Sequence, residues 1–119
     1  MPSERPASRL EDILENAQAV LRYTAGMDLA AFEADRRTYD AVERCLERIS
    51  EGAAKLGETA SVLVPGQPWQ KIRALGNRLR HEYDAIREDR LWDIVQNDLP
   101  ALCAACEEAL RRLREGQEP

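Results

Sequence analysis

The chain contains one histidine, His81, and this residue belongs to a row of polar side chains with helical spacing. Arg73, Asn77 and His81 follow one another at intervals of four residues, so on a helix their side chains project from one face. Arg80 falls beside them on that face. The row therefore offers a guanidinium, a carboxamide and an imidazole, with a second guanidinium next to them.

These are the side-chain types that RNA cleavage without a metal ion requires. In that reaction the 2′-hydroxyl attacks the adjacent phosphorus, a base takes its proton, and an acid protonates the leaving oxygen. Histidine titrates near neutral pH and serves either role, and the arginine fork suits phosphate oxygens. One histidine cannot easily be both acid and base, so we expect a homodimer with a composite site. Spacing alone still favours the alternative that His81 is an incidental surface residue.

The charge around the row differs from that of the whole chain. The segment from Lys71 to His81 has four Lys or Arg residues and no acid, whereas the chain has a net charge of −5. The net charge argues against a nucleic-acid partner, but screening confines a field to about 10 Å, so a local basic face can hold phosphate. The pattern alone favours a solvated helix face. The candidate RNA- or phosphate-binding cations are Lys71, Arg78 and Arg80.

Helices are expected to position these residues. Apolar side chains recur with helical spacing in three long stripes, at residues 10–21, 42–56 and 102–113. Pro68 is expected to open the helix that carries His81, and a further helix should begin near Glu88. No segment alternates as a strand. We predict an all-α fold, a single four- to five-helix up-and-down bundle over residues 1–119, with a core at about 9–115 and frayed ends at 1–7 and 116–119.

Local signals predict where these helices begin, end or bend. Ser8 and Glu11 match a capping box at the first helix start, and Gly26 suits its end. Asp28 is a candidate cap for a short turn. Gly52, inside a helical pattern, indicates close packing of a neighbouring backbone, and Pro100 should kink or restart a helix.

Composition narrows the class of protein. No apolar run approaches the ~20 residues that span a bilayer, and the N-terminus lacks a secretion signal. The cysteines, Cys45, Cys103 and Cys106, are odd in number and suit a reducing compartment. Cys103 and Cys106 have the spacing of metal ligands, but they lie in an apolar stripe, which favours a core role. We expect a cytoplasmic protein with no membrane association, no metal and no cofactor.

Residues 69–83, WQKIRALGNRLRHEY, resemble the signature of the HepT-like ribonuclease family of HEPN domains. In that signature an arginine and an asparagine are followed, after a short spacer, by His-x-Tyr. Three further blocks resemble the family in the same order, and the likeness covers roughly residues 9 to 110. These blocks are Leu10–Leu14, Ala41–Leu56 and Asp98–Leu102.

The resemblance implies a specific biology. Family members are all-α and dimerise so that their Arg and His motifs meet in a cleft. Many are the toxin of a toxin–antitoxin pair whose partner is a minimal nucleotidyltransferase antitoxin. In the best-understood type that partner attaches AMP to the tyrosine of His-x-Tyr, here Tyr83. RNA is then the expected substrate and DNA is not, although the sequence alone favours Tyr83 as a residue at the edge of the core.

Gly76 departs from the family pattern. The family motif, R-x4-H, has its arginine at the position that Gly76 occupies. In one interpretation Arg73, one turn earlier, supplies the charge, assisted by Arg78 or Arg80, and the catalytic residues are His81, Arg73 and Asn77. In the other, catalysis is lost and the chain serves as a binding partner or substrate of a nucleotidyltransferase. A purely structural helical dimer is the third possibility. The missing side chain of Gly76 would permit a close helix contact, including one across a dimer.

Overall fold

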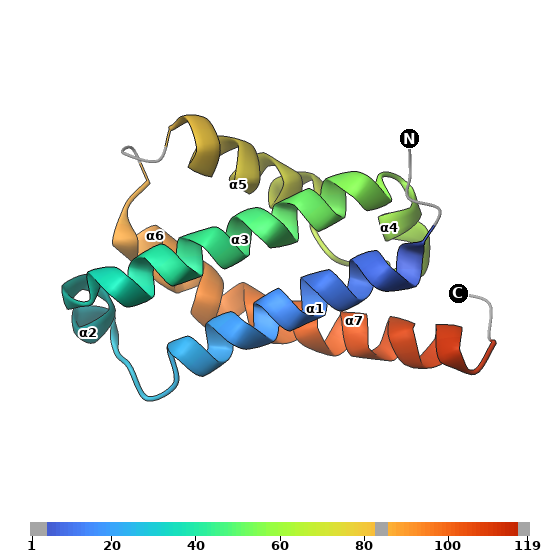
Figure 1. Cartoon of the computed structure of the whole chain (residues 1–119), viewed down its shortest axis with the longest axis horizontal. Helices are drawn as coiled ribbons and strands as arrows, with labels where there is room; N and C mark the ends of the chain where they lie inside the picture. Colours follow the sequence, from blue (N-terminus) through green and yellow to red (C-terminus); the bar gives the residue numbers. More distant parts are fainter. Residues whose placement is uncertain (1–4, 83–85, 117–119) are drawn as a thin grey trace.

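The computed structural model describes residues 5–82 and 86–116. Over these residues the chain forms α-helices and one π-helical turn and no strand, which confirms the predicted all-α fold (Figure 1). The elements are α1 (Pro6–Tyr23), α2 (Leu29–Ala34), α3 (Arg36–Leu56), α4 (Thr59–Leu63), α5 (Trp69–His81), α6 (Glu88–Asp93), the π-helical turn η2 (Ile94–Asp98) and α7 (Leu99–Arg114).

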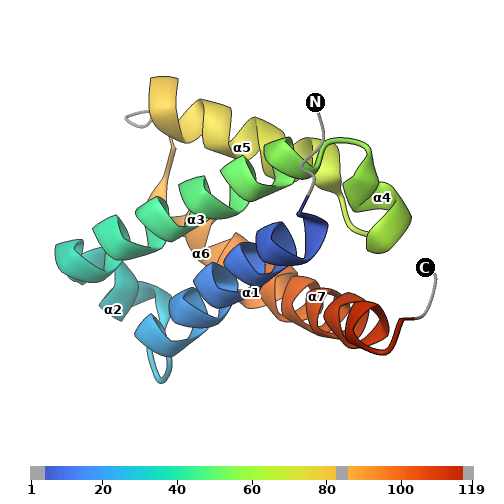
Figure 2. The ribbon, with the colours of Figure 1, turned by 45° about the vertical axis from the view of Figure 1, so that its right-hand side comes forward.

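The long helices are arranged as an up-and-down bundle, as predicted. α1 and α3 run side by side in opposite directions, α7 packs along α1, and α5 packs along α3 (Figures 1 and 2). The short helices α2 and α6 lie together at one end, and α4 lies at the other. α5 is therefore an edge helix whose main support is α3.

The core is formed by the apolar stripes that the sequence indicates in α1, α3 and α7. Full burial of each large side chain contributes about 1.5–3 kcal/mol to folding. Among residues 5–82 and 86–116, no helix is long and apolar enough to cross a membrane. Buried members of the three stripes include Leu10, Ile13, Val20, Val42, Leu46, Ile49, Leu56, Leu102, Cys106 and Leu110.

Some of the predicted helix boundaries are confirmed and one is wrong. The side chain of Asp28 caps α2, because its Oδ1 accepts a hydrogen bond from the backbone N–H of Ala31 at 2.8 Å. The capping box at Ser8 does not form, because α1 already begins at Pro6. Proline at a first helical position has a preset φ and no N–H to satisfy, so it starts the helix ahead of Ser8. Pro6 and Ala7 thus belong to α1 rather than to a frayed end.

Glycine and proline positions explain the remaining connections. Gly26, with φ of 78°, lies in the turn after α1. A Cβ atom on Gly52 would lie 2.8 Å from Ile13 Cγ1, so the predicted close packing is with a side chain of α1 more than with its backbone. Pro100 lies in the first turn of α7, directly after η2, where the helix restarts. The short helix α4 was not predicted.

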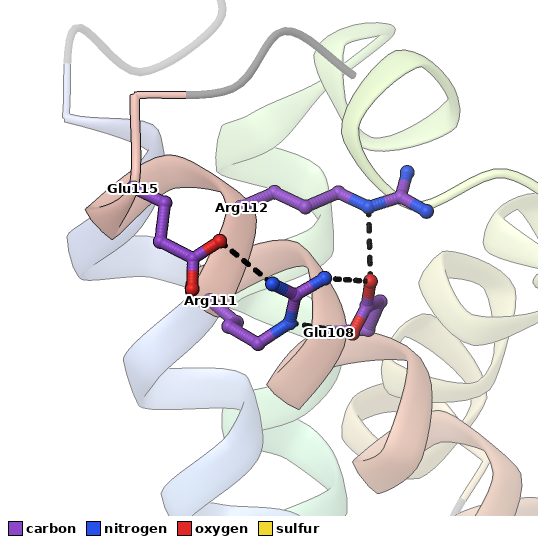
Figure 3. Close-up of polar contacts among 4 residues, drawn as sticks. All are labelled: Glu108, Arg111, Arg112 and Glu115. Carbon is purple, nitrogen blue, oxygen red and sulfur yellow. Dashed lines mark hydrogen bonds and ion pairs between the residues drawn. The ribbon is translucent and has the colours of Figure 1, made fainter.

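The C-terminal turn of α7 carries a ladder of charges (Figure 3). Glu108 accepts hydrogen bonds from Arg111 at 2.6 and 3.0 Å and from Arg112 at 3.0 Å. Arg111 also donates to Glu115 at 2.7 Å. The sequence places basic residues at this helix end, where they suit the negative end of the helix dipole, and the structure pairs two of them with acids.

Candidate functional site

α5 positions every predicted site residue that the structure describes. The helix begins at Trp69, whose indole N–H donates a hydrogen bond to the carbonyl of Val64, in the loop before α5, at 2.9 Å. Trp69 and Leu79 are buried and anchor the helix, while His81 is its last residue and is exposed. Helical geometry thus ends at His81, with Glu82 as the C-cap. Tyr83, the predicted site of AMP attachment, lies outside the described residues.

α5 meets α3 at Gly76 and Ser50. The Ser50 hydroxyl donates to the Arg73 carbonyl at 3.0 Å, and both Ser50 and Gly76 are buried. A Cβ atom on Gly76 would come within 3.0 Å of Ser50 Oγ and Ser50 Cβ, closer than real Cβ atoms approach their neighbours. The close contact expected at Gly76 is therefore made to α3 of the same chain. An arginine at this position would require the two helices to separate.

The polar residues of α5 divide into two sets around its buried stripe. At about 100° per residue, Arg73, Asn77, Arg80 and His81 lie on one side of the stripe, as predicted. Lys71 and Arg78 lie on the other side. The six candidates therefore border the stripe from its two edges and together cover one polar arc of the helix, in which Arg78 lies three residues before His81.

Lys71 and Arg78 border a groove of about 480 Å³ between α5 and the α6–η2–α7 segment. Arg90 of α6 reaches the same groove from the opposite wall. The apolar lining includes Leu46, Ile49, Ile72, Leu75, Ile94, Leu99 and Leu102. Ile72 and Leu75 are apolar but only half-buried, because they line this groove.

Two arginines flank Gly76 on the side that carries His81. Arg73 is half-buried, and Arg80 is exposed. Nη1 of Arg80 lies 3.3 Å from the position of a Cβ atom on Gly76. The Arg80 guanidinium thus lies near Gly76, the position where the resemblance leads us to expect an arginine.

Among the residues that the structure describes, no acid pairs with the cations of α5. Within residues 5–82 and 86–116, the side chains of Lys71, Arg73, Arg78 and Arg80 form no hydrogen bond or ion pair. The basic end of α7 differs, because Glu108 binds two of its arginines. α5 itself contains no acid. Four cations thus lie on α5 of an acidic chain, and the nearest acid along the sequence is Glu82, directly after His81.

The cysteines are part of the core. Cys45, Cys103 and Cys106 are buried free thiols. Burial raises the pKa of the Cys106 thiol to about 12, so its reactive thiolate is scarce at neutral pH. In the part of the chain that the structure describes, no group of three or more His, Cys, Asp or Glu residues is placed to hold a metal ion.

Sequence reasoning missed Ser50 and Arg90. Ser50 was visible as a polar residue on the buried stripe of α3, between Leu46 and Ala53. A polar side chain at such a position usually has a specific partner, here the Arg73 carbonyl. Arg90 gave no comparable signal, because its place depends on how α6 faces α5.

Comparison with known proteins identifies the family of the chain. The model of the family described as "Ribonuclease HepT-like" matches residues 13–109. "Putative RNase MJ0127" of Methanocaldococcus jannaschii is 34% identical over 118 residues, which are 99% of this chain and 97% of that protein. "Probable ribonuclease HepT" of Thermococcus cleftensis is 31% identical over 93 residues, 78% of this chain and 84% of that protein. No solved structure matches the chain. The chain therefore belongs to the HepT-like ribonuclease family.

Proposed function

We propose that the chain is an RNA endonuclease that needs no metal ion and works as a homodimer. The observation that carries the proposal is the exposed His81 at the end of α5, one turn after Asn77, on a helix whose Arg73, Arg78 and Arg80 side chains form no hydrogen bond or ion pair within residues 5–82 and 86–116. Membership of the HepT-like ribonuclease family makes RNA the substrate to test. The homodimer follows from chemistry, since one histidine per chain cannot easily both remove and donate a proton.

The proposed reaction is an internal transfer at phosphorus. The 2′-oxygen forms a bond to the adjacent phosphorus while the bond from phosphorus to the 5′-oxygen breaks. His81 of one copy takes the 2′-hydroxyl proton, and the second copy's histidine protonates the leaving oxygen. The Asn77 carboxamide and a guanidinium stabilise the negative charge that builds on the phosphoryl oxygens. The products are a 2′,3′-cyclic phosphate and a 5′-hydroxyl.

We further propose that the chain is the toxin of a toxin–antitoxin pair. Its antitoxin would be a minimal nucleotidyltransferase that joins the Tyr83 oxygen to the α-phosphorus of ATP, with release of pyrophosphate. Tyr83 follows His81 by two residues, so an adenylyl group there would add bulk and negative charge beside the phosphate site. Support for this role comes from the family resemblance, and an adjacent gene for a short nucleotidyltransferase would strengthen it.

The nuclease is tested with the purified chain and a short end-labelled RNA in EDTA. We expect cleavage that leaves cyclic-phosphate ends and falls by about 10²-fold or more in His81→Ala, because proton transfer contributes roughly 10²–10⁴ to the rate. Gln70→Ala is the matched control, because Gln70 is an exposed polar residue at the opposite end of α5. Cleavage that is undiminished in His81→Ala, or lost in EDTA, contradicts the proposal.

One observation favours a second candidate function. Gly76 stands in place of the family arginine, and the contact with Ser50 leaves no room for a larger side chain there. The chain would then be a catalytically degenerate domain that binds a nucleotidyltransferase and accepts AMP. Incubation with that partner, ATP and RNA separates the two functions. Modification of Tyr83 without RNA cleavage at any protein concentration would establish the second, and a structural dimer would show neither.

A further inference from the structure

The position of the Arg80 head group bears on which cation serves His81. Nη1 of Arg80 lies 3.3 Å from the place where a side chain on Gly76 would begin. Arg80 follows Gly76 by four residues, so the two are neighbours on the helix surface. The guanidinium thus lies over the one position of α5 that lacks a side chain and where the family carries its arginine.

Helix geometry separates Arg80 from Arg73, the other candidate. Side chains on a helix lean toward its N-terminus and cover the turn before their own Cα atom. Arg80 accordingly covers Gly76 and Asn77, and His81 leans over Asn77 from the adjacent position. Arg73 leans in the same direction, toward the start of α5, which carries its side chain farther from His81. Its Cα atom is about 12 Å from that of His81 along the axis at ~1.5 Å per residue.

The contact between α5 and α3 fixes this arrangement. The hydrogen bond from Ser50 to the Arg73 carbonyl holds the helices together, and Gly76 permits their close approach. The Arg80 side chain remains exposed and, within the described residues, without a hydrogen bond or ion pair. The N–H donors of its guanidinium are therefore available to an anion.

We propose that Arg80, rather than Arg73, is the principal phosphate-binding cation of the candidate site that contains His81, with its guanidinium held over Gly76. In this proposal the positive charge that the family places at the position of Gly76 is supplied instead by Arg80, one helical turn later. The catalytic part of this inference rests on the proposed ribonuclease function, whereas the binding of a phosphate by Arg80 can be tested without it.

The first test compares kcat/KM for RNA cleavage in Arg80→Ala and Arg73→Ala. We expect a loss of about 10²–10³ in Arg80→Ala, as for removal of a transition-state donor, and a smaller loss in Arg73→Ala. Added guanidinium ion should restore part of the activity of Arg80→Ala, and Arg80→Lys should fall in between, because lysine keeps the charge and loses the fork. Arg48→Ala is the matched control, since Arg48 is exposed on α3 about 160° around the helix from Ser50.

The second test measures binding of a 2′-O-methyl RNA oligonucleotide, which cannot be cleaved, at several salt concentrations. Loss of one phosphate contact should lower the affinity of Arg80→Ala and reduce its salt slope by about 0.7, the value expected for single strands. A wild-type chain that never cuts RNA would refute the proposed nuclease, and the binding measurement would then decide the role of Arg80. A larger loss in Arg73→Ala, or unchanged binding in Arg80→Ala, would overturn the inference.

Discussion

Gly76→Ala probes the contact on which the candidate site depends. Alanine is normally the better helix residue, so this substitution in an open helix would stabilise the protein by about 1 kcal/mol. At Gly76 the new methyl group would come within 3.0 Å of Ser50 Oγ and Cβ, and α5 would have to move away from α3. We therefore expect the opposite sign, a loss of stability.

The expected change in the free energy of unfolding combines two destabilising effects and one stabilising effect. Overpacking at a tight contact costs about 1–3 kcal/mol, and losing the hydrogen bond from Ser50 to the Arg73 carbonyl costs about 1 kcal/mol. The higher helix propensity of alanine returns about 1 kcal/mol. The net expectation is a destabilisation of about 1–3 kcal/mol. With a urea m-value near 2 kcal/mol/M, a loss of 2 kcal/mol lowers the unfolding midpoint by about 1 M.

The assay is urea unfolding followed by circular dichroism at a fixed protein concentration. The informative control is the double variant Ser50→Gly/Gly76→Ala, because Ser50→Gly removes both atoms that the new methyl group would strike. Adding Gly76→Ala to Ser50→Gly should be neutral or stabilising, so its sign should reverse between the two backgrounds. Ala74→Gly, at an exposed position of α5, calibrates helix propensity at about 1 kcal/mol. A urea unfolding midpoint of Gly76→Ala that is equal to or above that of the wild type would refute this reasoning.

Three further predictions concern elements away from the site. Asp28→Ala should lower stability by about 1 kcal/mol in urea unfolding, because the N–H of Ala31 loses its cap; an unchanged midpoint would show that the cap contributes nothing. Hydrogen bonds from Arg111, and then from Arg112, lower the pKa of Glu108 from 4.5 to about 2. Its stabilising effect should therefore be complete above pH 4.5 and lost as the pH falls toward 2, so thermal melts of wild type and Glu108→Gln should differ at pH 7 and converge at pH 2. The Cys106 thiol should react with a thiol reagent only after unfolding, and rapid labelling of the native chain would contradict its burial.

Gly76, where the family resemblance leads us to expect an arginine, is closely packed in this chain. The glycine does not leave an empty place, because α3 closes on it from one side and the Arg80 guanidinium lies near it from the other. Loss of the arginine at Gly76 is thus compatible with a cation beside His81. The decisive comparison is between Arg80→Ala and Arg73→Ala, since the sequence alone favoured Arg73.

The sequence by itself determined the long helices of the fold. Apolar stripes with helical spacing predicted the long helices, because a helix with one buried face has apolar residues that recur with its 3.6-residue period. The Asp28 cap was also readable, because its partner is three residues away. The Ser8 capping box was wrong because a competing local signal, Pro6 at the helix start, prevailed. The short helix α4 was missed, because five residues are too few to display a helical period.

Only the tertiary structure decided how the site is assembled. Sequence spacing placed Arg73, Asn77, Arg80 and His81 on one face of a helix and favoured Arg73 as the cation, but it could not show the Arg80 guanidinium near Gly76. The proposed role of Arg80 depends on that position and on the contact of Gly76 with Ser50 of α3. The groove bordered by Lys71 and Arg78 likewise exists because α6 and α7 face α5 across it. Distances within a helix follow from its period, whereas distances between helices follow from how their side chains pack, which no single segment encodes.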